Sequence, residues 1–301
     1  MSESAEYKGV IVPMVTPFKE DMNVDEDAVR RIVDHLIDGG VDGIFAAGTT
    51  GEAASISAEQ KKRLVKITAE HTDKRAVVYA GISGNCFEES VTAAADYVSL
   101  GADVLVAHPP FFYPLSDQET INYFSKLADG TEAPLIVYNI PKTTGMSVSL
   151  DVIEQLSRHP NIVGVKDSEN TEGRLEEAVK RFTGRSDFAY IVGCAVLSAK
   201  SLSMGAAGIV PSTGNLRPEL YKSLYDNAVT GNVSAAEKYQ QQTDQLSAVY
   251  QKNRSLGQSL AALKAAMYVT GLCGPTVLPP FETLDNKRIE AIKKELAAIS
   301  F

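Results

Sequence analysis

Short apolar runs alternate along the chain with longer stretches in which apolar positions recur at helical spacing. This alternation is typical of repeated βα units, which build a parallel sheet. Eight such units are present, and eight strand-plus-helix units can close a (β/α)8 TIM barrel. The expected strands are Gly9–Val15, Gly43–Ala47, Ala76–Ala80, Asp103–Ala107, Pro134–Tyr138, Ile162–Lys166, Phe188–Val192 and Gly208–Pro211.

Helical patterns lie between these strands and again after the last one. Ser57 and Ser116 are well placed as N-caps. We expect residues 1–230 to form the barrel that carries the active site, and residues 231–301 to form a helical appendage packed on it, since no Gly/Ser-rich or Pro-rich linker separates the two. The expected helices include Asp25–Gly39, Ala58–His71, Glu88–Leu100, Asp117–Leu127, Leu150–Arg158, Ala235–Tyr250, Leu256–Thr270 and Asn286–Ala298.

Lys166 ends an apolar run that starts at Asn161 and reads as a buried parallel strand. Burial disfavours the charged form of lysine and lowers its pKa, which makes the side chain an amine nucleophile. Such an amine can form a Schiff base with a ketone. The alternative is a lysine at a strand end that points into water.

The second expected strand runs into a turn in which Thr49 and Thr50 lie between two glycines, Gly48 and Gly51. A sharp turn there would offer hydroxyls and backbone N–H groups to an anion such as a carboxylate. The same residues also suit an ordinary turn. We expect Glu52, directly after the turn, to accept hydrogen bonds from loop N–H groups rather than to act as a catalytic acid.

Tyr138 ends the fifth expected strand, so its ring should lie near the barrel axis with the hydroxyl at the rim. A phenol in that position can relay a proton. A tyrosine that caps the core and binds water is the alternative. Both Lys166 and Tyr138 would lie at the carboxyl ends of strands, the face where barrels carry their functional groups.

Composition excludes several classes of function. The net charge is −9 and the pI is about 5.1, which argues against nucleic acid or an anionic membrane as a partner. No segment has transmembrane length, and the start of the chain, Met1 to Lys8, resembles no signal peptide, so we expect a cytoplasmic protein. The cysteines and histidines are scattered without ligand spacing, so we expect neither a disulfide framework nor a metal site, and no cofactor.

Three motifs in order carry a family resemblance: Gly48-Thr-Thr-Gly-Glu52, Tyr138-Asn-Ile-Pro141 and Gly164-Val-Lys-Asp167. Together they resemble the dihydrodipicolinate synthase / N-acetylneuraminate lyase family, and the resemblance spans nearly the whole chain. It implies a class I aldolase in which Lys166 condenses with pyruvate or another 2-keto acid. It also implies that the enzyme is a homotetramer. The catalytic scheme needs no metal, because the iminium withdraws the electrons released by carbon–carbon cleavage.

The resemblance also implies roles for other residues. Tyr138 would shuttle protons at the imine and at the aldol hydroxyl, and Thr49 would join its relay. Thr50 and nearby backbone N–H groups would hold the keto acid's carboxylate. Gly193 and Val210 match positions that line the pyruvate end of the family's pocket.

Departures from the family's sequence patterns narrow the range of expected substrates. Thr143 stands where the synthases carry an arginine that binds the carboxylate of the aldehyde substrate. Loss of this arginine argues against aspartate semialdehyde as the substrate, although the adjacent Lys142 could partly replace it as a point charge. The stretch after Gly193, Cys-Ala-Val-Leu, is apolar where sialic acid lyases carry acidic residues. Phe112 stands where most members have a relay tyrosine that acts across a subunit interface, so either Tyr113 takes over or the relay is altered.

We therefore expect a lyase that releases pyruvate and an aldehyde from a 2-keto-3-deoxy acid, either a sugar acid or a 4-hydroxy-2-oxo acid. The alternatives within the family are 4-hydroxy-tetrahydrodipicolinate synthase, N-acetylneuraminate lyase and a keto-deoxy sugar acid dehydratase. A keto-acid-binding regulatory barrel is the non-enzyme alternative. Phe111 and Phe112, apolar residues at the expected barrel mouth, favour a contact between copies of the chain.

Overall fold

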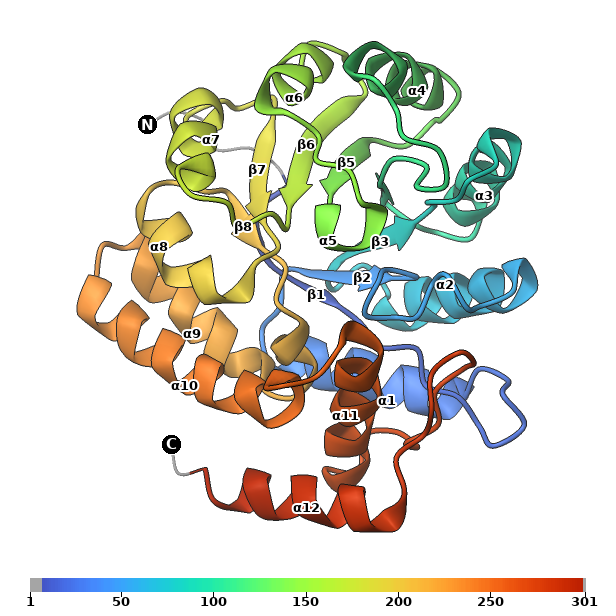
Figure 1. Cartoon of the computed structure of the whole chain (residues 1–301), viewed down its shortest axis with the longest axis vertical. Coiled ribbons are helices and arrows are strands. Elements are labelled where there is room, and N and C mark those ends of the chain that lie inside the picture. The colour runs from blue at the N-terminus through green and yellow to red at the C-terminus, as the bar shows by residue number, and fades with distance from the viewer. Residues whose placement is uncertain (1–6, 300–301) are drawn as a thin grey trace.

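The computed structural model describes residues 7–299 and confirms the eight-stranded parallel barrel (Figure 1). The strands are hydrogen-bonded in sequence order, and β8 closes on β1. The first six residues, on which the expectation about a signal peptide partly rests, lie outside the described part of the chain. The strands are β1 Gly9–Pro13, β2 Gly43–Ala46, β3 Val77–Gly81, β4 Val104–Ala107, β5 Leu135–Asn139, β6 Ile162–Asp167, β7 Ala189–Val192 and β8 Gly208–Ile209.

The helices around the barrel begin at well-formed caps. The side chains of Ser57 and Ser116 cap α2 and α4 as expected, and Ser116 forms a capping box with Glu119. The helices of the barrel units are α1 Glu26–Asp38, α2 Ala58–Thr72, α3 Phe87–Ser99, α4 Asp117–Asp129, α5 Pro141–Thr144, α6 Leu150–Leu156, α7 Arg174–Phe182, α8 Ser198–Ser203 and α9 Pro218–Val229. Two short 3-10 helices are η1 Ala195–Leu197 and η2 Ser212–Asn215.

The strand register brings the two motifs of greatest interest together. Tyr138 of β5 pairs with Lys166 of β6, and Asn139 pairs with Asp167. Residues directly paired on neighbouring parallel strands point to the same face of the sheet. Tyr138 is buried in the cluster that fills the barrel interior, with Phe45, Val210 and other apolar side chains. A larger apolar cluster joins the outside of the barrel to its helices.

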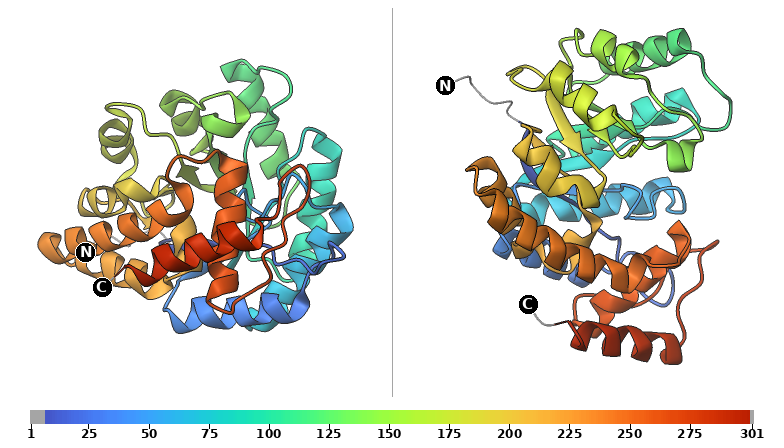
Figure 2. Two further views of the ribbon diagram at one scale, coloured as in Figure 1. Left: turned by 60° about the horizontal axis from the view of Figure 1, so that its bottom comes forward. Right: turned by 60° about the vertical axis from the view of Figure 1, so that its left-hand side comes forward.

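Three helices follow the last barrel unit: α10 Val233–Gln251, α11 Leu256–Val269 and α12 Asn286–Ala297. α10 packs along α9, and α11 contacts both α10 and α12 (Figure 2). α11 is buried over most of its length, including Lys264. The division into a barrel and an appendage at residue 230 stays a prediction. Among the described residues, no helix is at once long and apolar enough to span a membrane.

Candidate active site

Lys166 lies inside the barrel rather than pointing into water, and only 5% of it is exposed. Its Nζ lies 3.7 Å from the centroid of the Tyr138 ring and 4.9 Å from that of Phe45. Burial lowers the pKa of Lys166, and this effect outweighs the opposing influence of Tyr138. A larger fraction of this side chain is therefore a free amine at neutral pH than in a solvated lysine.

A buried polar network holds the strand ends that carry Lys166 and Tyr138. Asn139 donates from Nδ2 to Asp167 Oδ1 at 2.8 Å and to Glu169 Oε2 at 2.9 Å. Arg174 donates from Nε to the other oxygen of Asp167, also at 2.8 Å. The Asp167 side chain is fully buried, so this partner compensates a charge that would otherwise be costly. Asn139 also accepts from the backbone N–H of Val148 and thereby fixes the segment after α5.

The loop after β2 is built as a tight turn. The Thr16 hydroxyl donates to the carbonyl of Gly51 at 2.7 Å, and Glu52 adopts a positive φ of 59°. Glu52 is a structural acceptor, as expected, but its partners do not belong to its own loop. Its Oε2 accepts from the backbone N–H of Leu278, and its Oε1 lies 2.5 Å from Lys264 Nζ. This loop is therefore held by the C-terminal part of the chain.

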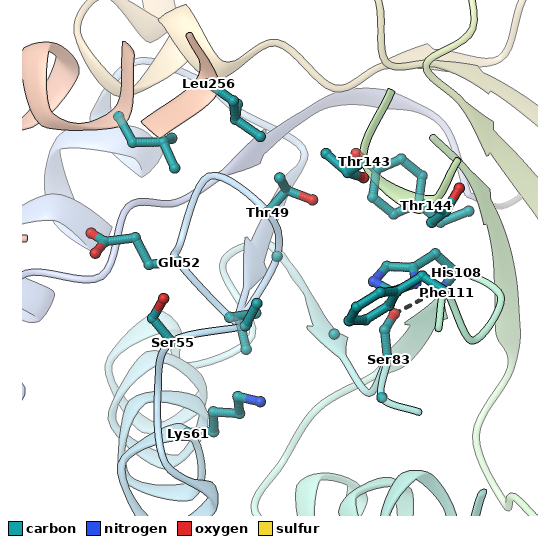
Figure 3. A pocket seen from close by; sticks show the side chains of 18 of the residues that line it. Thr49, Glu52, Ser55, Lys61, Ser83, His108, Phe111, Thr143, Thr144 and Leu256 are labelled. Atoms are coloured by element: carbon teal, nitrogen blue, oxygen red, sulfur yellow. Dashed lines mark hydrogen bonds between the residues drawn. The ribbon is translucent and has the colours of Figure 1, made fainter. Parts of the chain in front are cut away.

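A cavity of about 380 Å³ opens at the carboxyl ends of β2 to β5 (Figure 3). Thr49, Tyr138 and Thr143 line it, which brings together residues that follow or end different strands. Three apolar residues of the C-terminal part also line the cavity, namely Leu256, Leu260 and Phe281. The barrel units therefore supply the polar lining residues together with apolar ones such as Phe45 and Phe111, whereas α11 and the segment that follows it supply apolar side chains.

The other predicted residues are not among those that line this cavity, namely Lys166, Thr50, Gly193, Val210, Phe112 and Tyr113. Gly193 lies against Lys166, because a Cβ built on it would be 3.2 Å from Lys166 Cε and would overlap Ser168 Oγ. Val210 is buried in the barrel interior, and Thr50 is half-buried in the turn. Phe112 and Tyr113 are 72% and 73% exposed and lie outside the cavity of their own chain.

Two kinds of lining residue were not expected from the sequence. His108 and Ser83 follow β4 and β3, and the backbone N–H of His108 donates to Ser83 Oγ at 2.8 Å. The position of His108 directly after an expected strand could have indicated that it lines the site. Leu256, Leu260 and Phe281 gave no comparable signal, because they belong to helical and loop segments far along the chain.

Comparison with known proteins identifies the family to which this chain belongs. The model of the dihydrodipicolinate synthetase family matches residues 6–299. A 4-hydroxy-tetrahydrodipicolinate synthase of Methanosphaera stadtmanae is 30% identical over 293 residues, which cover 96% of this chain and 97% of the relative. The structure of dihydrodipicolinate synthase from Bacteroides thetaiotaomicron superposes with a TM-score of 0.93 at 30% identity, over 98% of this chain and 100% of that one.

The chain is also similar to YagE of Escherichia coli, whose assignment as a 2-dehydro-3-deoxy-D-gluconate aldolase is provisional. The identity is 29% over 296 residues, covering 97% of each chain. The crystal structure of YagE in complex with pyruvate has a TM-score of 0.91, over 97% of this chain and 98% of that one. The chain thus belongs to the dihydrodipicolinate synthetase family and is a lyase of the aldolase type.

Proposed function

We propose that this enzyme cleaves a 2-keto-3-deoxy acid to pyruvate and an aldehyde through a Schiff base on Lys166. The observation that carries the proposal is the buried amine of Lys166 next to the Tyr138 ring. A buried amine with a lowered pKa can attack the ketone carbon, and loss of water then gives an iminium. Cleavage of the bond between C3 and C4 passes its electron pair to the iminium and leaves an enamine. Protonation at C3 and hydrolysis release pyruvate and restore the lysine.

In this proposal the surrounding residues serve different parts of the substrate, namely the imine, the carboxylate and the aldehyde end. Tyr138 moves protons at the imine, and Thr49 joins its relay from the loop after β2. Thr50 and the N–H groups of its turn hold the carboxylate. Gly193 and Val210 line the pyruvate end, where Gly193 leaves room for Lys166. Thr143, Phe112 and Tyr113 belong to the aldehyde end or to the mouth of the site.

The choice of substrate rests on what the chain lacks and on its relatives. Thr143 lines the cavity where a synthase carries the arginine for a second carboxylate. The segment Cys194 to Leu197 is apolar where sialic acid lyases carry acidic residues for the sugar hydroxyls. YagE has been crystallised with pyruvate and is provisionally a 2-dehydro-3-deoxy-D-gluconate aldolase. A short 2-keto-3-deoxy sugar acid or 4-hydroxy-2-oxo acid therefore suits this cavity better than aspartate semialdehyde or sialic acid.

We propose further that the enzyme acts in the cytoplasm as a homotetramer. The aromatic loop after β4 supports contact between copies, since Phe111, Phe112 and Tyr113 are 43%, 72% and 73% exposed in the single chain. Single exposed aromatics are common, but three in succession form a patch that a second copy would cover. Light scattering measures the assembly, and a monomer would contradict this part of the proposal.

The activity itself is tested by incubating the enzyme with 2-keto-3-deoxygluconate, 4-hydroxy-2-oxoglutarate and N-acetylneuraminate in parallel. We expect pyruvate and an aldehyde from one of the first two substrates and none from the third. Lys166→Ala should abolish the release of pyruvate, and Tyr138→Phe should slow it by about 10²-fold or more. A dioxo acid as product would instead assign a dehydratase, and condensation of pyruvate with aspartate semialdehyde would assign a synthase.

A further inference from the structure

His108 is the one histidine of the described chain that lines the cavity. It follows the last residue of β4, and its ring lies edge-on to Tyr138, with 6.3 Å between the ring centroids. The centroid of the Phe111 ring lies 5.9 Å from that of the His108 ring. Figure 3 shows the His108 ring reaching into the cavity beside Phe111, with Thr49 on the opposite side. The ring therefore has a defined orientation toward the space that the substrate would occupy.

The hydrogen bond at Nδ1 fixes the tautomer. Nδ1 lies 2.8 Å from the carbonyl oxygen of Pro109, which can only accept, so Nδ1 must carry the proton and donate it. In the neutral ring, Nε2 is then left with a free lone pair. Among residues 7–299, no side chain or backbone group hydrogen-bonds to Nε2. A base without a protein partner is therefore available at the cavity.

The surroundings keep this ring neutral. Burial lowers the pKa of His108, and positive charge on Lys166 of β6 or on Lys61 of α2 lowers it further. The hydrogen bond to Pro109 acts in the opposite direction but does not outweigh burial. Tyr138 of β5 is the other titratable group in contact with the ring. At neutral pH the imidazole can thus accept a proton without first losing one.

We propose that His108 is a catalytic acid–base residue that serves the carbon chain of the substrate, while Tyr138 serves the imine. This inference rests on the proposed function. During cleavage the C4 hydroxyl gives its proton to His108 Nε2, the C3–C4 electron pair moves into the enamine, and the aldehyde leaves. The imidazolium then returns that proton to C3, which regenerates the iminium of pyruvate and the neutral ring. Among the described residues of the loop after β4, His108 and Phe111 line the cavity, and of these two only His108 can transfer a proton.

The test uses pyruvate alone, so it does not depend on the identity of the aldehyde. In deuterium oxide, reversible formation of the enamine exchanges the methyl protons of pyruvate, which NMR follows directly. We expect His108→Asn to keep the borohydride-trapped pyruvate adduct on Lys166 but to slow this exchange by about 10²-fold or more. The amide introduced by this substitution can still donate to Pro109 but cannot act as a base. His159→Asn, which removes a histidine paired with Asp129 at 3.0 Å, is the matched control and should exchange like the wild type.

The pH profile separates catalysis from a positioning role. Protonation of Lys166 also slows imine formation at low pH, so the exchange rate at each pH is divided by the rate of borohydride trapping at that pH. In the wild type this ratio should fall as the pH drops below the pKa of His108, which lies below its ordinary value of about 6.5. This acid limb should disappear in His108→Asn, and in His108→Gln as a second variant in case the first does not fold. Exchange within a few-fold of the wild type, or an unchanged acid limb, in a variant that forms the adduct would overturn the role of His108 and leave the Schiff-base mechanism standing. Absence of the adduct in the wild type would overturn both.

Discussion

Lys264 of α11 and Glu52 of the loop after β2 form an ion pair in which neither side chain has more than 1% of its surface exposed. Lys264 Nζ also donates to the carbonyl of Thr276 at 2.8 Å and lies 4.0 Å from the centroid of the Phe18 ring. Burial lowers the pKa of Lys264, and Glu52 opposes this effect. The pair joins the C-terminal helices to the loop that presents Thr49 and Thr50, so these helices help to shape the candidate active site.

Breaking this pair should therefore weaken the fold and the site together. Lys264→Met leaves the carboxylate of Glu52 buried without its partner, and we expect the free energy of unfolding to fall by about 3–5 kcal/mol. Chemical denaturation measures the change. Lys222→Met, which removes one member of the exposed pair with Asp226, is the control and should cost about 0–1 kcal/mol. An equally small cost for Lys264→Met would show that the buried pair does not hold this loop.

Gly193 should be required for the reactivity of Lys166. In Gly193→Ala the new methyl group would overlap Ser168 Oγ and press on Lys166 Cε, so we expect slower formation of the pyruvate adduct. Adding Ser168→Ala removes the nearest obstacle and should restore part of the rate. Gly130→Ala, where the new methyl group finds no atom closer than 3.4 Å, should leave the rate unchanged. A wild-type rate in Gly193→Ala would mean that Lys166 does not use this space.

Arg174 should be essential to the network behind the two strand ends. Arg174→Met leaves Asp167 fully buried without its cation, and we expect a loss of about 3–5 kcal/mol in the free energy of unfolding. Arg181→Met serves as control, since its partners Asp151, Glu154 and Glu177 are all at least 46% exposed in their side chains. Thermal or chemical unfolding of both variants measures the two changes in the free energy of unfolding. Equal effects of the two substitutions would argue against a special role for the buried network.

The strand part of this architecture could be predicted from the sequence because a buried parallel strand is a short apolar run whatever surrounds it. β5 and β6 are found within one residue of the expected ranges at both ends. α5, with four residues, is too short to show a helical period, and α7 begins after Gly173 without a side-chain cap. The pattern of the chain gave no range for either helix, nor for α8 and α9.

The site was predictable where it depends on strand ends and not where it depends on distant segments. Tyr138 and Lys166 follow directly from the ends of neighbouring strands. The partner of Glu52 lies more than 200 residues away, and no local pattern indicates that contact. His108 stood at a strand end, but the tautomer and the free Nε2 depend on the conformation of the Pro109 carbonyl.

Formation of the pyruvate imine should depend on pH through the lowered pKa of Lys166. Only the free amine attacks the ketone, so the rate should fall as the pH drops through that pKa and should already have levelled off below the ordinary lysine value of about 10.4. Borohydride trapping at a series of pH values measures this rate, with Nα-acetyl-lysine as the solvated reference. A rate that keeps rising in parallel with the reference would show that burial does not activate this side chain.

The Schiff base on Lys166 is best tested by the mass of the intact enzyme after incubation with pyruvate and borohydride, followed by peptide mapping. We predict one reduced pyruvate adduct per chain, located on Lys166 and absent from Lys166→Ala. Labelling spread over surface lysines, or no adduct under conditions in which the enzyme is folded, would contradict the assignment of Lys166 as the Schiff-base residue.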